Sequence, residues 1–325
     1  MPQFQRFNAI LLIIAGATLT ACGGSNGGSG PPPPPPAQLA TITAVNAPQI
    51  AAAVYQTVIT ADDVAGLTAP TVSGPSTVSA KSQSSVMAVD EAEAEPCLVN
   101  GRASITISDS VVENLSNDPA VLAPGDRFEF GFENCDDGDG FITDGNFDIA
   151  VTGFSGDFFG LYRLQSDVTM TDFSLATGDE TVNLDADMSI DFDLRSLPVI
   201  TIAVSGGFID ELTERTGAPN SSTSLSDFSI TTTIDETNFP AAFQTTGSGA
   251  LMNSDFDGEV TFTIDTALRN LFEENPTSGV IVIVGANDAT VTITALSATE
   301  AQLEIDLGDG SAVQTVVVPW DDLLV

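Results

Sequence analysis

The chain contains no histidine, and this absence removes several classes of chemistry. Ser-His-Asp and Cys-His nucleophile systems need an imidazole as general base, and many zinc and iron sites need one as a ligand. Chemistry that uses carboxylates alone, such as that of a glycosidase pair, stays open. However, no pair stands out among 45 Asp and Glu, and one Trp and two Tyr leave few rings on which a sugar could stack.

Basic residues are also scarce. Eight Lys and Arg against 45 Asp and Glu give a formal net charge of −37. Because phosphate binding depends on basic side chains that displace counterions, this balance argues against a nucleic-acid partner. It also argues against peripheral binding to anionic lipid headgroups. The acidity fits a solvated surface whose repulsion is screened by salt, and divalent-cation binding is the alternative.

Long apolar runs are missing, and the run over residues 9–18 is too short to span a bilayer, which needs about 20 residues. It follows a short segment with one positive charge, Arg6, and precedes small residues, so residues 1–21 are predicted to be a secretory signal peptide. Leu19-Thr20-Ala21-Cys22 resembles the lipobox of bacterial lipoproteins. The resemblance implies cleavage before Cys22 and lipidation of Cys22, and an ordinary signal peptide with a chance cysteine is the alternative. Since Gly23 is not Asp, it further implies the outer membrane of a Gram-negative bacterium, with the body in the periplasm or at the cell surface.

Composition divides the remainder of the chain. Residues 22–36 combine a Gly/Ser-rich hinge with six consecutive prolines, which extend about 19 Å at roughly 3.1 Å per residue and predict a tether. Within 37–67, Asn46 can cap a helix, and Ile50, Val54 and Val58 recur at helical spacing. We predict a helix over 47–58, or reaching Val64. The Ser-, Thr-, Pro- and acid-rich stretch over 68–95 is predicted to be a linker.

From residue 96 the dominant hydrophobic period is two. Over residues 182–194, seven apolar residues alternate with polar ones, a pattern typical of a half-buried strand. Turns rich in Asp and Gly separate such segments at hairpin spacing, which favours an antiparallel meander. We therefore predict a mainly β fold with one N-terminal helix. Because one face of the meander is apolar, we expect it to be curled into a sandwich or barrel-like sheet.

The body spans 96–265, and the stretch over 266–325 is predicted to be either a C-terminal β subdomain or the final strands of the same sheet. A short helix is expected over 265–274, before Pro276, followed by strands. Four short motifs resemble uncharacterised β-rich envelope lipoproteins of Gram-negative bacteria, and this resemblance implies compartment and architecture but no activity. The motifs are Asn46-Ala47-Pro48, Phe132-Glu133-Asn134-Cys135, Asn275-Pro276-Thr277-Ser278-Gly279 and Pro319-Trp320-Asp321-Asp322-Leu323.

The cysteine count supports the lipobox and fits an oxidising compartment. With Cys22 lipidated, Cys97 and Cys135 remain as an even pair, and we predict that they form a disulfide.

The turn over residues 136–144 is the best candidate metal site. Asp137, Asp139 and Asp144 could supply oxygens to calcium, which needs several around a tight loop. Phe141 departs from the EF-hand spacing, and Asp and Gly are also what hairpin turns use, so an ordinary turn is favoured. The aspartates over 185–193 form a second acidic surface, for which a solvated face is favoured. No cofactor other than calcium is expected.

These patterns predict a lipid-anchored cell-envelope protein with a non-enzymatic binding or structural role. The membrane is contacted through the lipid anchor, and the partner is an unknown protein or small molecule. One alternative is a carboxylate-based, carbohydrate-active hydrolase, which needs two acids in a cleft with one raised pKa. The other is a carrier of a lipophilic ligand inside the curled sheet, which needs an apolar cavity.

Overall fold

The computed structural model describes residues 38–68, 95–115, 117, 119–138, 140–271 and 274–324. The predicted signal peptide, Cys22 and the tether lie outside the described residues, as do Asp139 and almost all of the predicted linker.

Helix α2 (Ala47–Thr68) is the N-terminal helix, and it is longer than the 47–58 segment predicted. Thr43 and Asn46 close the turn before it, with the Thr43 amide donating to Asn46 Oδ1 at 2.7 Å. The Asn46 carbonyl then accepts from the Ile50 amide at 2.9 Å. The buried apolar residues described in α2 follow three- and four-residue spacing, so one stripe of the helix faces the sheet: Ala47, Ile50, Ala51, Val54, Tyr55 and Val58.

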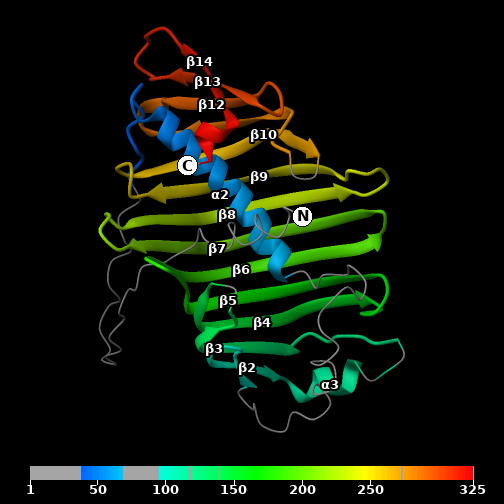
Figure 1. Cartoon of the computed structure of the whole chain (residues 1–325). Helices are drawn as coiled ribbons and strands as arrows, with labels where there is room; N and C mark the ends of the chain where they lie inside the picture. The colour runs from blue at the N-terminus through cyan, green and yellow to red at the C-terminus, as the bar shows by residue number, and fades with distance from the viewer. Residues whose placement is uncertain are drawn as a thin grey trace, which may run out of the picture.

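Fourteen strands form one antiparallel sheet in which each strand pairs with its neighbours in the sequence (Figure 1). The strands are β1 (Glu95–Pro96), β2 (Asn100–Ile107), β3 (Arg127–Asp136), β4 (Ile142–Gly156), β5 (Tyr162–Thr177), β6 (Glu180–Ser196), β7 (Val199–Arg215), β8 (Ser221–Asp235), β9 (Ala242–Asn253), β10 (Glu259–Leu271), β11 (Ser278–Val284), β12 (Thr290–Ala295), β13 (Glu300–Asp306) and β14 (Gln314–Pro319). Three short helices complete the described chain: α3 (Asp109–Leu115), η1 (Ala286–Asp288) and η2 (Trp320–Leu323). The mainly β fold, the antiparallel meander and the N-terminal helix are confirmed.

The sheet is open, and the expectation that it curls into a sandwich or barrel is wrong. β1 and β14 lie at opposite ends of the strand order and do not pair. Helix α2 crosses one face diagonally, and its buried residues share one hydrophobic core with the apolar side chains of the strands (Figure 1). At the end of the chain, Trp320 of η2 packs on Tyr55 of α2 with ring centroids 4.5 Å apart. Among the described residues, α2 packs on β7, β8, β12 and β13, so helices rather than a second sheet cover this part of the apolar face.

Strand β6 shows how the alternating sequence builds this face. Its apolar side chains are all buried, while the residues between them point to the opposite, polar face. The buried set is Val182, Leu184, Ala186, Met188, Ile190, Phe192 and Leu194.

The predicted helix over 265–274 is wrong, because residues up to Leu271 continue β10. The strand pairs on both sides here, with Leu268 opposite Thr245 of β9 and Arg269 opposite Ser278 of β11. Pairing on two sides outweighs the helical spacing of a few apolar residues, since a helix this short is marginal alone. Residue 265 lies within β10, and β11 to β14 extend the same sheet.

Bulges interrupt the ladder at two similar sequences. Asp172 in β5 and Asp227 in β8, each followed by Phe-Ser, have positive φ angles of 49° and 46°. Both lie where the register shifts. The similarity therefore marks two bulges, which bend and twist a strand locally.

Candidate functional site

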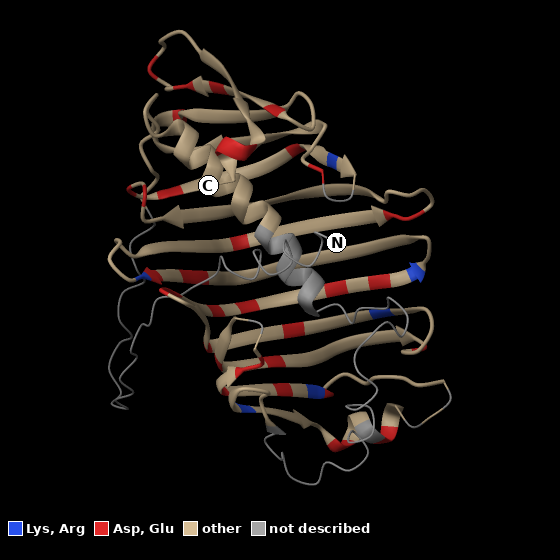
Figure 2. Ribbon diagram, viewed as in Figure 1, with Lys and Arg blue, Asp and Glu red and all other residues tan. Residues whose placement is uncertain are grey.

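The polar face carries the candidate site, a depression of about 370 Å³ across β4, β5, β6 and β7. Acidic residues lie along many strands of the sheet, with few basic residues among them (Figure 2). The residues around the depression are mostly polar: Thr152, Gln165, Ser166, Asp167, Ser189, Ile190, Asp191, Ala203 and Ser205.

Two rows of residues, aligned by the register of the strands, form the floor of this depression. Gln165, Asp191 and Ala203 lie opposite one another in β5, β6 and β7, and they make one row. Asp167, Ser189 and Ser205 make the neighbouring row. From the sequence, the aspartates of β6 were predicted to form a solvated face. The two rows could not be predicted, because they depend on the register of three strands.

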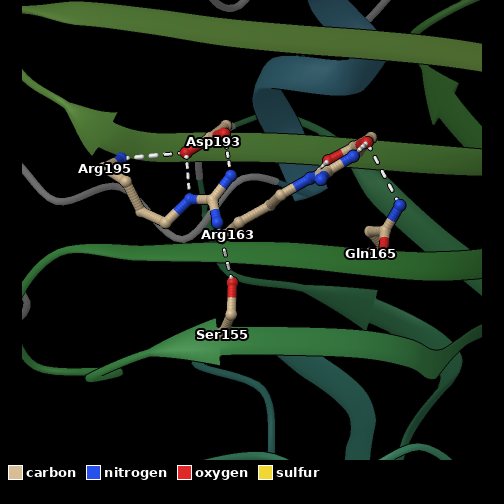
Figure 3. A network of polar contacts seen from close by, with 6 residues as sticks. Ser155, Arg163, Gln165, Asp193 and Arg195 are labelled. Carbon is tan, nitrogen blue, oxygen red and sulfur yellow. Dashed lines mark hydrogen bonds and ion pairs between the residues drawn. The ribbon is translucent and has the colours of Figure 1, made fainter.

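An arginine holds the carboxylate at the centre of the first row. Arg163 Nε donates to Asp191 Oδ1 at 2.7 Å, and Arg163 Nη2 donates to Asp191 Oδ2. Gln165 Nε2 donates to the same Oδ2 at 3.2 Å (Figure 3). The hydrogen bond that Arg163 donates to Asp191, together with the negative charge of Asp191, raises the pKa of Arg163 above its ordinary value. This bidentate pair fixes both side chains at the rim of the depression.

A second arginine pair lies beside the first. Arg195 Nε donates to Asp193 Oδ1 at 2.9 Å, and Arg195 Nη1 donates to Ser155 Oγ at 3.2 Å (Figure 3). The hydrogen bond from Arg195 lowers the pKa of Asp193. Two of the chain's eight basic residues are thus used to hold aspartates of β6.

The second row offers groups that face solvent. Ser189 Oγ donates to Asp167 Oδ1 at 2.7 Å. Asp167, Ser189 and Ser205 are exposed. The depression therefore combines carboxylate acceptors with hydroxyl and amide groups, which can exchange hydrogen bonds with hydroxyls of a ligand.

The residues of the predicted calcium site are used locally. Asp137 Oδ1 accepts from the Leu98 amide at 2.9 Å, and Asp144 Oδ1 accepts from the Gly145 amide at 2.8 Å. In the part of the chain that the structure describes, the group of side chains close enough to hold a metal ion is Cys97, Cys135 and Asp137. Their ligand atoms lie within 4.8 Å of one another, and Asp144 is not a member.

Cys97 and Cys135 are joined in a disulfide with their Cα atoms 5.5 Å apart. The bond ties the segment between β1 and β2 to the end of β3. A cysteine binds a metal ion as a thiolate, so both cysteines of the Cys/Asp cluster could be ligands only with this disulfide reduced.

Glu211 in β7 is a titratable residue that the sequence analysis did not identify. A register shift near residues 206–208 moves it onto the apolar face, where Leu184 of β6 and Thr223 of β8 are its register partners. Burial raises the pKa of Glu211 to about 8. The change from even-numbered apolar residues (Ile202, Val204) to odd-numbered Ile209 was the sequence signal for this shift.

Tyr162 is fully buried among aromatic rings on the apolar face. Its ring lies 5.8 Å from that of Phe154, 5.6 Å from that of Phe158 and 6.0 Å from that of Phe192. Within the described residues its hydroxyl has no hydrogen-bond partner, and burial raises its pKa to about 12. Tyr162 belongs to the hydrophobic core of the apolar face and is not among the residues that line the depression.

Comparisons of the chain with protein-family models, curated proteins and solved structures gave no match. Among the described residues, no helix has the length and apolar character needed to cross a membrane. Function therefore has to be argued from the residues, and the resemblance to lipoproteins stays a prediction.

Proposed function

We propose that this chain is a lipid-anchored cell-envelope protein that binds a neutral, hydroxyl-rich ligand, such as an envelope saccharide, on the polar face of its sheet. The observation that carries the binding role is the depression over β4 to β7, with its two rows of polar side chains. The lipobox Leu19-Thr20-Ala21-Cys22 supports the anchor and the outer membrane.

The donors and acceptors favour a neutral ligand. Gln165, Ser189 and Ser205 provide amide and hydroxyl groups, while Asp167 provides a carboxylate that accepts hydrogen bonds from hydroxyls. The net charge of −37 repels anions. A site this shallow buries little of its ligand, so modest affinity is expected.

The geometry favours binding over hydrolysis. A carboxylate-based hydrolase keeps one acid protonated as a proton donor. Both oxygens of Asp191 are already engaged, because Oδ1 accepts from Arg163 Nε and Oδ2 accepts from Gln165 Nε2. Asp167 is exposed, its Oδ1 accepts from the Ser189 hydroxyl, and the described lining of the depression contains no aromatic residue that would form a cleft around a sugar.

The lipophilic carrier has less support. The apolar face carries buried side chains of α2 and the strands in one packed core. The depression lies on the other face, and polar residues dominate its lining. A lipid chain would leave these polar groups without partners, which costs free energy.

Lipidation is tested by expressing the full chain in a Gram-negative bacterium with an alkyne-bearing palmitate analogue. We expect the wild-type chain to take up the label and to sediment with outer membranes. Cys22→Ser should lose both properties. A variant that keeps label and membrane association would refute the anchor.

Binding is tested separately by NMR titration with neutral oligosaccharides, and with a uronic-acid oligosaccharide as the anionic comparison. We expect Ser189→Ala to weaken neutral-ligand binding about fivefold, the factor that corresponds to one hydrogen bond of about 1 kcal/mol. Thr292→Ala is the matched control, because Thr292 belongs to β12, away from the depression. Equal effects of the two substitutions, or no binding of neutral oligosaccharide, would refute the proposed site.

A further inference from the structure

The two ends of the open sheet differ in how they are protected. At one end β1 has two residues, one of them Pro96, and Cys97 next to it is tied to β3. At the other end β14 has six residues without a charged side chain, and among the described residues it pairs with β13 alone. Exposed edge strands are normally protected by charges, bulges or prolines. In β14 such protection is limited to Pro319, at the end of the strand.

The outward-facing backbone groups of β14 follow from its ladder with β13. Pro319 lies opposite Glu300, and the Trp320 amide donates to the Thr299 carbonyl at 3.2 Å in the same register. Backbone groups point alternately toward and away from an antiparallel partner. The backbone N–H and C=O groups that point toward β13 are thus those of Trp320, Val318 and Val316. The backbone groups that point outward, away from the sheet, are those of Pro319, Val317 and Thr315. Pro319, which has no N–H, belongs to the outward set, as expected of an edge.

The side chains of the edge are apolar and accessible. Val316 is 42% exposed and Val317 is 49% exposed. Val316 lies opposite Leu303, which is fully buried, so Val316 belongs to the apolar face. Val317 lies opposite Gln302, on the polar face. Within the described part of the chain, the apolar face therefore continues to the edge of the sheet and is partly exposed there.

We infer that β14 is a self-association edge, at which β14 of one copy pairs antiparallel with β14 of a second copy about a twofold axis at Val316. In this register Thr315 of each copy lies opposite Val317 of the other, and the two pairs exchange four backbone hydrogen bonds. The two Val316 side chains meet in the closer, non-hydrogen-bonded pair on the apolar face. An axis at Val317 would place Pro319 opposite Thr315 and lose donors.

A second copy fits this edge better than an unlimited stack of copies. Addition of β14 to the β1 end would meet a two-residue strand that contains Pro96. The twofold arrangement uses each β14 once, so association closes at a dimer. Most other surfaces of a chain with a net charge of −37 repel a second copy, whereas β14 carries no charge.

Cysteine crosslinking in the envelope tests the register. In the full chain, Val316→Cys places two thiols opposite each other at a separation that a disulfide can bridge, with Cα atoms about 4.5 Å apart. Val317→Cys is the matched control, since its side chain lies on the other face and its register partner is Thr315. After oxidation with copper phenanthroline, we expect a disulfide-linked dimer from Val316→Cys and several-fold less from Val317→Cys. Adding Val317→Pro, which removes an outward N–H, should suppress the Val316→Cys dimer.

Three results would overturn the inference. They are equal crosslinking at both positions, crosslinking of Val316→Cys to a different envelope protein, and a Val316→Cys dimer that Val317→Pro leaves unchanged. Sedimentation of the full chain carrying Cys22→Ser, with its edge intact, provides a measurement free of edge substitutions. We expect a monomer–dimer equilibrium that depends on protein concentration, and a monomer at every concentration would also overturn it.

Discussion

Glu211 gives the stability of this protein a specific dependence on pH. Its carboxyl is half-buried on the apolar face of β7, with Leu184 and Thr223 as register partners. Burial raises its pKa from 4.5 to about 8. Thr213 Oγ1 donates to Glu211 Oε1 at 3.4 Å and opposes this shift, while the charge of Glu180 adds to it.

The sign of the effect follows from the two pKa values. Below pH 4.5 the carboxyl is protonated in the folded and the unfolded chain, and it has no effect on stability. Between 4.5 and about 8 the unfolded chain releases the proton while the folded chain keeps it, so the free energy of unfolding falls as pH rises. Above about 8 both states are ionised, and the loss is complete.

The shift in the pKa of Glu211 sets an upper limit on the change in the free energy of unfolding. A difference of about 3.5 pH units at 1.36 kcal/mol per unit corresponds to about 5 kcal/mol. Because the carboxyl keeps contact with water, screening reduces this value, and we expect Glu211→Gln to stabilise the protein by about 2 to 3 kcal/mol at about pH 9. At about pH 5.5 the gain should fall to about 1 kcal/mol or less.

Urea unfolding at constant salt measures this difference. The wild-type chain, Glu211→Gln and the exposed control Glu236→Gln are compared at about pH 5.5 and about pH 9. Repulsion among the many other carboxylates is common to all three chains and cancels in the comparison. A stabilisation by Glu211→Gln that is the same at both pH values, or that equals the effect of Glu236→Gln, would refute the reasoning.

Two further predictions concern packing and backbone geometry. Trp320 is fully buried against Tyr55, and Trp320→Ala should lower the free energy of unfolding by about 3 to 5 kcal/mol, measured by urea unfolding followed by circular dichroism, with a smaller loss for Trp320→Phe. Gly145 has a φ of +96°, and a Cβ there would lie 2.1 Å from the Asp172 carbonyl oxygen, so Gly145→Ala should lower the melting temperature by many degrees. Gly178→Ala is its control, since Gly178 also has a positive φ but has no atom within 4 Å of the added Cβ, and equal losses at both glycines would contradict the steric argument.

The sequence predicted the elements whose pattern is local. Strand β6 is long, strictly alternating and buried on one side, so its period alone determined both its type and its two faces. The start of α2 was predicted from Asn46 and the spacing of Ile50 and Val54. Each of these features depends on residues close together in the chain.

The features that were not predicted from the sequence depend on strand pairing and on the elements that pack on the apolar face. Curling was expected because an apolar face needs a partner, but α2 and the terminal Trp320 pack on that face instead. Residues 265–271 became strand because β9 and β11 pair with them on both sides. Glu211 was missed because a register shift moved it from one face to the other.

The candidate sites follow the same division. Asp137 and Asp144 were chosen from a local cluster, and the structure uses both in local hydrogen bonds. The depression around Asp191 depends on Arg163, which is 28 residues away in the sequence and reaches it through the register of β5 and β6. The composition shows that basic residues are rare, but it does not predict which carboxylates Arg163 and Arg195 bind.

An open sheet limits where a ligand or partner can bind. Since each strand pairs with its sequence neighbours, the apolar and the polar face remain separate along the meander. The core formed with α2 occupies the apolar face, which leaves the polar face and the two ends of the sheet available. The polar face contains a shallow depression with fixed carboxylates. At the β14 end, backbone groups that have no strand partner among the described residues lie beside exposed valines. Binding on the face and association at the end use different groups, so the two can occur together in one molecule.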